Sequence, residues 1–274
     1  MNIKPIKTHK IDLTKEELTL LITLYAKALD YRSENSILND KTADDLVNSI
    51  EYDFEKLKKN GIGNYIAVRA KQYDEWIQEF LEVNPDAVIV QLGCGLDTRI
   101  TRINPPLSVS WFDIDYPSVI RLRGNFFSNQ SGYTMIGSSV TNADWLTKIP
   151  KDRPVIIIAE GVLEYLVEND VKSLINRLTD YFIHGQIAFD VMNSFAINSG
   201  RPGLEETTGA VHKWAVDAVH EVDKLDPKLK RISCLRLFGS KYIHKLPLKY
   251  RLVYGVMNFI PPFRNMICLL RYEF

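Results

Sequence analysis

The spacing of apolar residues predicts helices in the first third of the chain. Apolar side chains recur at helical spacing from about Thr14 to Arg32, and Thr14 with Glu17 has the spacing of a capping box. Residues 43–50 and 64–83 continue the helical pattern as far as Pro85. We therefore expect an N-terminal helical cap over residues 1–84.

Beyond Pro85 the pattern changes to short β-rich runs. Four runs read as strands, at residues 86–93, 108–115, 154–160 and 185–192. Two segments between them, residues 116–127 and 167–182, can each hold a helix. Alternating strands and helices predict an α/β core with a mostly parallel sheet.

The alternation stops between Asn193 and about Lys230. A stretch containing glycine and proline, residues 199–209, predicts a loop, and residues 211–222 predict a helix. We expect a lid insertion at about 193–230 within a core domain over residues 85–274. Two β-like segments, 231–239 and 266–274, then return and could close one edge of the sheet.

Charge and composition narrow the classes of partner. The chain has 274 residues, and its 34 basic and 34 acidic side chains cancel. Neither a nucleic acid nor a membrane is therefore expected as a partner, and a small molecule is. The polar N-terminus and the lack of an apolar run of about 20 residues predict a cytoplasmic protein. The spacing of Cys94, Cys234 and Cys268 predicts free thiols and no metal site, and the oligomeric state is left open.

The stretch VIVQLGCGLDTRI, residues 88–100, predicts a nucleoside site. Gly93 and Gly95 follow the first strand of the core, where a glycine-rich turn lets a ligand approach the backbone. Asp115 ends the next strand, twenty positions after Gly95, where doubly wound sites place an acid for ribose hydroxyls. Thr98 replaces the third glycine of a dinucleotide motif, and Asp97 puts a negative charge where a pyrophosphate would lie. S-adenosylmethionine suits this turn better, although an ordinary turn with Asp97 as a helix cap is the alternative.

Three motifs carry a family resemblance. LGCGLDTR at 92–99, WFDIDYP at 111–117 and IIAEGVLEYL at 157–166 resemble the leucine carboxyl methyltransferase family, more closely its bacterial polyketide O-methyltransferase branch. The resemblance covers about residues 15–195. It implies a class I, Rossmann-like methyltransferase core with a helical N-terminal cap, and methyl transfer from S-adenosylmethionine to an oxygen, usually of a carboxylate. A small acceptor is favoured, with a protein C-terminus as the alternative.

The resemblance also implies roles for cofactor-binding residues. Arg69 matches the arginine that binds the methionine carboxylate, and its alternative is a salt bridge to Asp74. Ser139 and Val140 stand where the family places an acid and an apolar residue beside the adenine. The serine departs from that pattern. Asp144 either substitutes for the acid or caps a helix before Trp145.

Glu160 and Tyr165 belong to the third motif. Glu160 ends an apolar strand, where a buried acid needs a partner, so we expect it to face the ammonium or sulfonium of the cofactor. Tyr165 either lies near the sulfonium and substrate or packs in the core.

The acceptor decides whether a base is needed. A carboxylate with a pKa of about 4 is already ionised at neutral pH, whereas a phenol with a pKa of about 10 would be helped by a base. His212 and His220 are the candidate bases, and Arg201 could bind an anionic substrate. The alternatives in function are a nicotinamide-dependent oxidoreductase, disfavoured by the motif at 97–98, and a non-catalytic S-adenosylmethionine-binding protein.

Overall fold

The computed structural model describes residues 9–10, 18–58 and 63–274. The expected helix start at Thr14 and Glu17 lies outside the described residues. Four helices precede the main sheet: α1 (Thr19–Tyr31), α2 (Lys41–Ser49), α3 (Glu55–Lys58) and α4 (Tyr65–Val83). A short parallel pair, β1 (His9–Lys10) and β2 (Ile50–Glu51), was not predicted.

Seven strands form the main sheet. They are β3 (Val88–Leu92), β4 (Ser110–Asp115), β5 (Tyr133–Gly137), β6 (Val155–Ala159), β7 (Gly185–Met192), β8 (Lys230–Arg236) and β9 (Ile267–Glu273). Their order is β5-β4-β3-β6-β7-β9-β8, and the strands from β5 to β7 run parallel. The predicted parallel α/β core is confirmed. The strand order reverses beside β3, the position at which open α/β sheets bind ligands.

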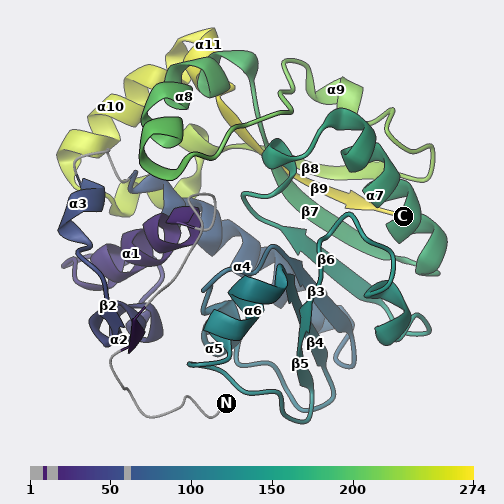
Figure 1. The fold of residues 1–274 in the computed structure, drawn as a ribbon. Helices are drawn as coiled ribbons and strands as arrows, with labels where there is room; N and C mark the ends of the chain where they lie inside the picture. The colour runs from purple at the N-terminus through teal and green to yellow at the C-terminus, as the bar shows by residue number, and fades with distance from the viewer. Residues whose placement is uncertain (1–8, 11–17, 59–62) are drawn as a thin grey trace.

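Successive strand residues enter two buried faces of the sheet. In β3, Val88, Val90 and Leu92 join a hydrophobic cluster with residues of α7 (Glu168–Tyr181). Ile89 joins the opposite cluster with residues of α1, α2 and α4. Helices thus cover both faces, which explains why the strands read as nearly continuous apolar runs. Figure 1 shows α7 and α1 on opposite sides of the sheet.

The N-terminal helices share their core with the sheet. Leu21, Leu24 and Ala28 on α1 are buried, and α1 packs against α2 and α4. Helix α4 in turn contacts β6 and α5 (Arg99–Ile103). The division at residue 84 stays a prediction. None of the described helices is long and apolar enough to cross a membrane.

The segment after β7 departs from the predicted structure. Residues 199–209 were expected as a loop, but α8 (Ser194–Thr208) includes most of them, so Arg201 lies in a helix. The side chain of Asn193 caps this helix through the amide of Ala196, and Gly209, in the left-handed conformation at φ 66°, ends it.

The expected helix over residues 211–222 is also wrong. Only α9 (Val219–Val222) is helical. The amides of Lys213 and Trp214 donate to the carbonyl of Glu164, and Val216 donates to Met192. These bonds to distant segments replace the local pairing that a helix would need.

The C-terminal strands close one edge of the sheet as predicted. β9 pairs antiparallel with both β7 and β8. Two helices between them were not predicted, α10 (Leu248–Phe259) and α11 (Pro261–Arg264). Strand β5 and helix α6 (Pro117–Arg123) lie at the opposite edge, and only the helix was predicted. The three cysteines are unbridged, as expected.

Candidate active site

A cavity of about 1240 Å³ lies beyond the carboxyl ends of the parallel strands. The segments that follow β3, β4, β5, β6 and β7 all contribute to it, together with α1 and α4. Ten of the sequence-predicted site residues line it: Arg69, Gly93, Gly95, Asp97, Asp115, Ser139, Val140, Glu160, Tyr165 and His212. The structure therefore brings together residues from both halves of the chain.

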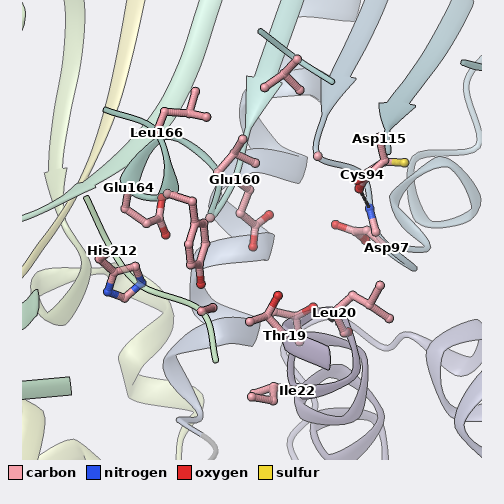
Figure 2. Close-up of a pocket in the computed structure, with 18 of the residues that line it drawn as sticks. Thr19, Leu20, Ile22, Cys94, Asp97, Asp115, Glu160, Glu164, Leu166 and His212 are labelled. Atoms are coloured by element: carbon pink, nitrogen blue, oxygen red, sulfur yellow. Dashed lines mark hydrogen bonds between the residues drawn. The ribbon is translucent and has the colours of Figure 1, made fainter. Parts of the chain in front are cut away.

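The glycine turn after β3 depends on two positive φ angles. Gly93 has φ 60° and Gly95 has φ 50°, a region that favours glycine. A Cβ on Gly93 would lie 2.5 Å from a methyl of Val162. The amide of Gly95 donates to Asp115 Oδ2 at 2.7 Å, so the turn is tied to the end of β4 (Figure 2).

Arg123 holds the same turn from α6. Its Nη1 donates to the carbonyls of Gly95 at 3.1 Å and Asp97 at 2.7 Å, and its Nη2 donates to Asp113 at 2.6 Å. This fully buried arginine fixes the turn through the backbone, and the sequence motifs did not single it out.

Asp97 is surrounded by cations. Its carboxylate lies 2.9 Å from Lys27 on α1, 3.2 Å from Arg99 and 3.0 Å from Arg102. Burial would raise the pKa of Asp97, but Arg99, Lys27 and Arg102 outweigh it and hold the pKa well below its usual range. These three cations compensate the negative charge of Asp97. The structure therefore does not support the expectation that Asp97 by itself repels a phosphate.

Arg69, which lines the cavity, donates hydrogen bonds to two carboxylates. Its Nε donates to Glu160 at 3.0 Å and its Nη1 to Asp190 on β7 at 2.8 Å. No described residue accepts a hydrogen bond from Nη2. The alternative partner, Asp74, instead pairs with Arg99 and Arg102, so that alternative is wrong.

Glu160 is bound by arginines on both sides. Arg99 contacts its second oxygen, opposite the Arg69 contact. Burial would raise the pKa of Glu160, and Arg99 and Arg69 reverse the shift and lower it. The Glu160 carboxylate is therefore ionised, and the two arginines compensate its charge. Glu160 also lines the cavity.

The segment that follows β5 lines another side of the cavity. Val140 is buried in the core and also lines the cavity. The hydroxyl of Ser139 bonds that of Thr141 at 2.8 Å, and Ser138 donates to Asp144 at 3.0 Å. Trp145 is the N-cap residue of the short helix that follows, and its side chain makes no capping hydrogen bond. Asp144 is therefore not the cap of this helix.

The other end of the cavity carries two neighbouring rings. The ring centroids of Tyr165 and His212 lie 4.9 Å apart, and both residues line the cavity, as do Met192 and Phe238. Figure 2 shows Glu164 and His212 at this end and Asp97 and Asp115 at the opposite one.

One of the expected substrate residues is not brought into the site. His220 lies on α9 and does not line the cavity. Arg201 lies on α8, and its side chain lies outside the described part of the chain.

Sequence reasoning missed several charged residues of this site. Arg99 belongs to the LGCGLDTR motif yet was assigned no role. Asp190 and Glu164 are buried acids. Asp190 interrupts an apolar strand, the same signal that identified Glu160.

The chain is related to known methyltransferases. Residues 20–179 match the model of the leucine carboxyl methyltransferase family. The tetracenomycin polyketide synthesis O-methyltransferase TcmP of Streptomyces glaucescens is 35% identical over 266 residues, 96% of this chain and 98% of that protein. The S-adenosyl-L-methionine-dependent methyltransferase dpfgK of Gibberella zeae is 32% identical over 244 residues, 81% of this chain and 82% of that protein.

Solved structures share the fold at low sequence identity. A DUF574 family protein from Streptomyces avermitilis superposes with a TM-score of 0.57 at 8% identity, over 76% of this chain and 83% of that one. The methyltransferase domain of bacterial CtHen1-CN has a TM-score of 0.50 at 12% identity, over 75% of this chain and 100% of that one.

This chain belongs to the leucine carboxyl methyltransferase family. It is an S-adenosylmethionine-dependent methyltransferase with a class I fold, and the class predicted from the three motifs is confirmed. The nicotinamide-dependent oxidoreductase considered as an alternative is therefore wrong.

A substitution at Arg99, the buried arginine between the N-terminal helices and the sheet, tests whether the charge network is needed for stability. Arg99→Met would leave Asp74, Asp97 and Glu160 short of a cation. We expect the free energy of unfolding in urea to fall by about 3–5 kcal/mol, the usual loss when one partner of a buried ion pair is removed.

The matched control is Arg32→Met, which breaks a half-exposed pair with Asp44. It should cost less than about 1 kcal/mol. Similar losses for the two variants would contradict a buried network.

Glu164 gives the protein a pH-dependent stability. Burial, with a smaller contribution from Asp190, raises the pKa of Glu164 from 4.5 to about 8. Between these values the unfolded chain loses a proton that the folded chain keeps, so stability falls as pH rises and levels off above about pH 8. Glu164→Gln removes this loss, and its melting temperature should exceed that of the wild type by a margin that grows from pH 5 to 8. The exposed neighbour Glu168→Gln should show no such margin, and a constant gap for Glu164→Gln would refute the shift.

Proposed function

We propose that this enzyme transfers the methyl group to an oxygen of a small-molecule carboxylate, with a phenol as the second candidate. One observation carries the proposal. At about 1240 Å³ the cavity exceeds the roughly 300–1,000 Å³ typical of a site for one ligand. Its volume leaves room for an organic acceptor beside the cofactor, at the end lined by Tyr165 and His212.

The relatives support a polyketide-type acceptor. TcmP is named for tetracenomycin polyketide synthesis, and this chain covers nearly its whole length. The neighbouring rings of Tyr165 and His212 suit a planar carbon skeleton of that kind. Modification of a protein C-terminus is less favoured.

The glycine turn and its neighbours fit S-adenosylmethionine. Asp115 would bind the ribose hydroxyls beside Gly93 and Gly95. Val140 would pack on the adenine, with Ser139 beside it. These groups surround one end of the cavity, and a carboxylate at the end of the second core strand is the usual ribose partner.

The methionine end would lie against Arg69. Its Nε and Nη1 are used by Glu160 and Asp190, whereas no described residue accepts from Nη2, which faces Gly161. A guanidinium edge of this kind can bind a carboxylate. Glu160 would face the ammonium or sulfonium group.

The charge balance of the site also suits this cofactor. The connected network contains four cations and five carboxylates: Lys27, Arg69, Arg99, Arg102, Asp40, Asp74, Asp97, Glu160 and Asp190. Its formal charge is −1, opposite to the net positive charge of the cofactor. Such complementarity favours binding in a poorly solvated cavity.

Positioning supplies most of the catalysis in this proposal. When bound, S-adenosylmethionine supplies an electrophilic methyl group on a sulfonium. The turn at 93–97 and Arg69 orient it, and the acceptor end of the cavity aligns the nucleophilic oxygen and excludes water. A carboxylate acceptor needs no base, because it is ionised at neutral pH. A phenol would need one, and His212, which lines the cavity, would be the candidate.

Arg69 offers a direct test of cofactor orientation. Arg69→Lys keeps the charge but not the planar fork, so we expect the Kd of S-adenosylhomocysteine to rise by about 10-fold or more in calorimetry. The Kd of adenosine, which has no carboxylate, should change little. Equal losses for the two ligands would show that Arg69 acts only through Glu160 and Asp190.

A product assay tests the reaction itself. The protein, methyl-labelled S-adenosylmethionine and a panel of aromatic carboxylic acids and phenols should give labelled methyl esters, with the acids favoured. Labelled phenol ethers alone would move the proposal to its second candidate. Cofactor binding without any labelled product would indicate a non-catalytic relative.

A further inference from the structure

Two glutamates in one turn differ in their partners. Glu160 and Glu164 both follow β6, and both line the cavity. Arg69 and Arg99 bind the carboxylate of Glu160. Apart from its own backbone amide, no described residue forms a hydrogen bond or ion pair with the carboxyl group of Glu164. The residue is only 3% exposed, and its Oε2 is buried without a partner.

A buried carboxyl oxygen without a partner calls for an explanation. Leaving such a group unsatisfied costs about 1–3 kcal/mol, so native structures avoid it unless a ligand completes the site. Glu164 lies at the acceptor end of the cavity, with Tyr165 and His212 (Figure 2). An acceptor there would be the missing partner.

The surroundings keep Glu164 neutral. Burial raises the pKa of Glu164 to about 8, with Asp190 as the next cause and Glu160 as a smaller one. Arg69 acts in the opposite direction but is already bound to Glu160 and Asp190. At neutral pH the group is mostly a carboxylic acid, which can donate a hydrogen bond.

Two phenols also lie near Glu164, and neither titrates near pH 8. Burial raises the pKa of both Tyr65 and Tyr165, so these phenols stay neutral. His212 and Lys213 line the same cavity from the segment after α8.

The backbone fixes the position of this acid. The carbonyl of Glu164 accepts from the amides of Lys213 at 2.7 Å and Trp214 at 3.2 Å. The turn that carries Glu164 is thus bound to the segment that carries His212. A donor held in this way can orient a ligand with little loss of entropy.

We propose that neutral Glu164 is an acceptor-binding residue, whose O–H donates to one oxygen of the acceptor carboxylate and leaves the other oxygen for methylation. This inference rests on the proposed function and adds a residue that selects the acceptor. A carboxylate only accepts hydrogen bonds, so it complements a protonated acid. A deprotonated Glu164 would instead repel it.

The reaction balances without a proton transfer. The bond between the acceptor oxygen and the methyl carbon forms as the bond between sulfur and that carbon breaks. The negative charge of the acceptor and the positive charge of the sulfonium cancel, and the proton of Glu164 stays in place. The ester product is a weaker acceptor than the carboxylate, which favours its release.

The test uses benzoate, 2-naphthoate and anthracene-2-carboxylate as acceptors, with 2-naphthol as the phenol. Wild type, Glu164→Gln and Glu164→Leu are compared from pH 6 to 9.5 by ester formation. The wild-type KM for the acids should rise above about pH 8 with little change in kcat, because the ionised form loses its donor and repels the acceptor.

The glutamine variant separates hydrogen-bond donation at position 164 from titration of the carboxyl group. Glu164→Gln keeps a neutral donor, so it should stay within about 3-fold of the wild type at pH 7 and lose the rise in KM above pH 8. Glu164→Leu has no donor and should lose about 10-fold or more in kcat/KM. Glu168→Gln, an exposed change in the adjoining helix, should behave as the wild type.

Four results would overturn the role of Glu164, the last of them together with the proposed function. Unchanged kcat/KM in Glu164→Leu would show that it does not bind the acceptor. An inactive but folded Glu164→Gln, with wild-type activity on 2-naphthol that rises with pH, would make Glu164 a base for a phenol. Glu164→Gln with the same KM profile as the wild type would assign the titration to another group. No ester from any acid with the wild type would contradict the proposed function itself and the role of Glu164 with it.

Discussion

Buried charges between the first helices and the sheet constrain the whole active site. Lys27 on α1 and Asp40 at the start of α2 reach the glycine turn through Asp97 and Arg102. Arg99 extends the contact to Glu160 after β6. Buried charges must be paired, so these segments have few alternative arrangements. The network is better explained as a determinant of position than as a source of net stability.

The same buried charges give two neighbouring acids different protonation states. Glu160 lies between two arginines and is ionised, whereas Glu164, four residues later, has no cation bound to it and is mostly neutral at pH 7. Asp190 raises the pKa of Glu164 and also pairs with Arg69, one of the two arginines bound to Glu160. The cavity is therefore lined by an ionised carboxylate at Glu160 and by a mostly neutral acid at Glu164.

Local sequence patterns predicted the parallel strands and the cofactor turn. Apolar runs ending in Gly93, Asp115 or Glu160 are signals within a few residues, and the structure places all three at one cavity. The partners of those residues were not predictable in this way. Arg69 meets Asp190 across 121 positions of sequence, and no local rule specifies that pairing.

The segment after β7 shows the limit of local rules most clearly. Its glycines and proline suggested a loop at 199–209 and its apolar spacing a helix at 211–222, and both were wrong. Bonds from Lys213 and Trp214 to Glu164 decide the second case, because they use amides that a helix would need. Tertiary hydrogen bonds overrode local preference beside the proposed acceptor end, where the family resemblance was also weakest.

Amide hydrogen exchange with and without S-adenosylhomocysteine tests the central claim most directly, that buried charges couple the first helices to the cofactor turn. The ligand should slow exchange in the wild type at 93–102 and also in α1, which carries Lys27. In Lys27→Met the protection should persist at 93–97 but be lost in α1. Protection of the turn without any change in α1 of the wild type would contradict the coupling.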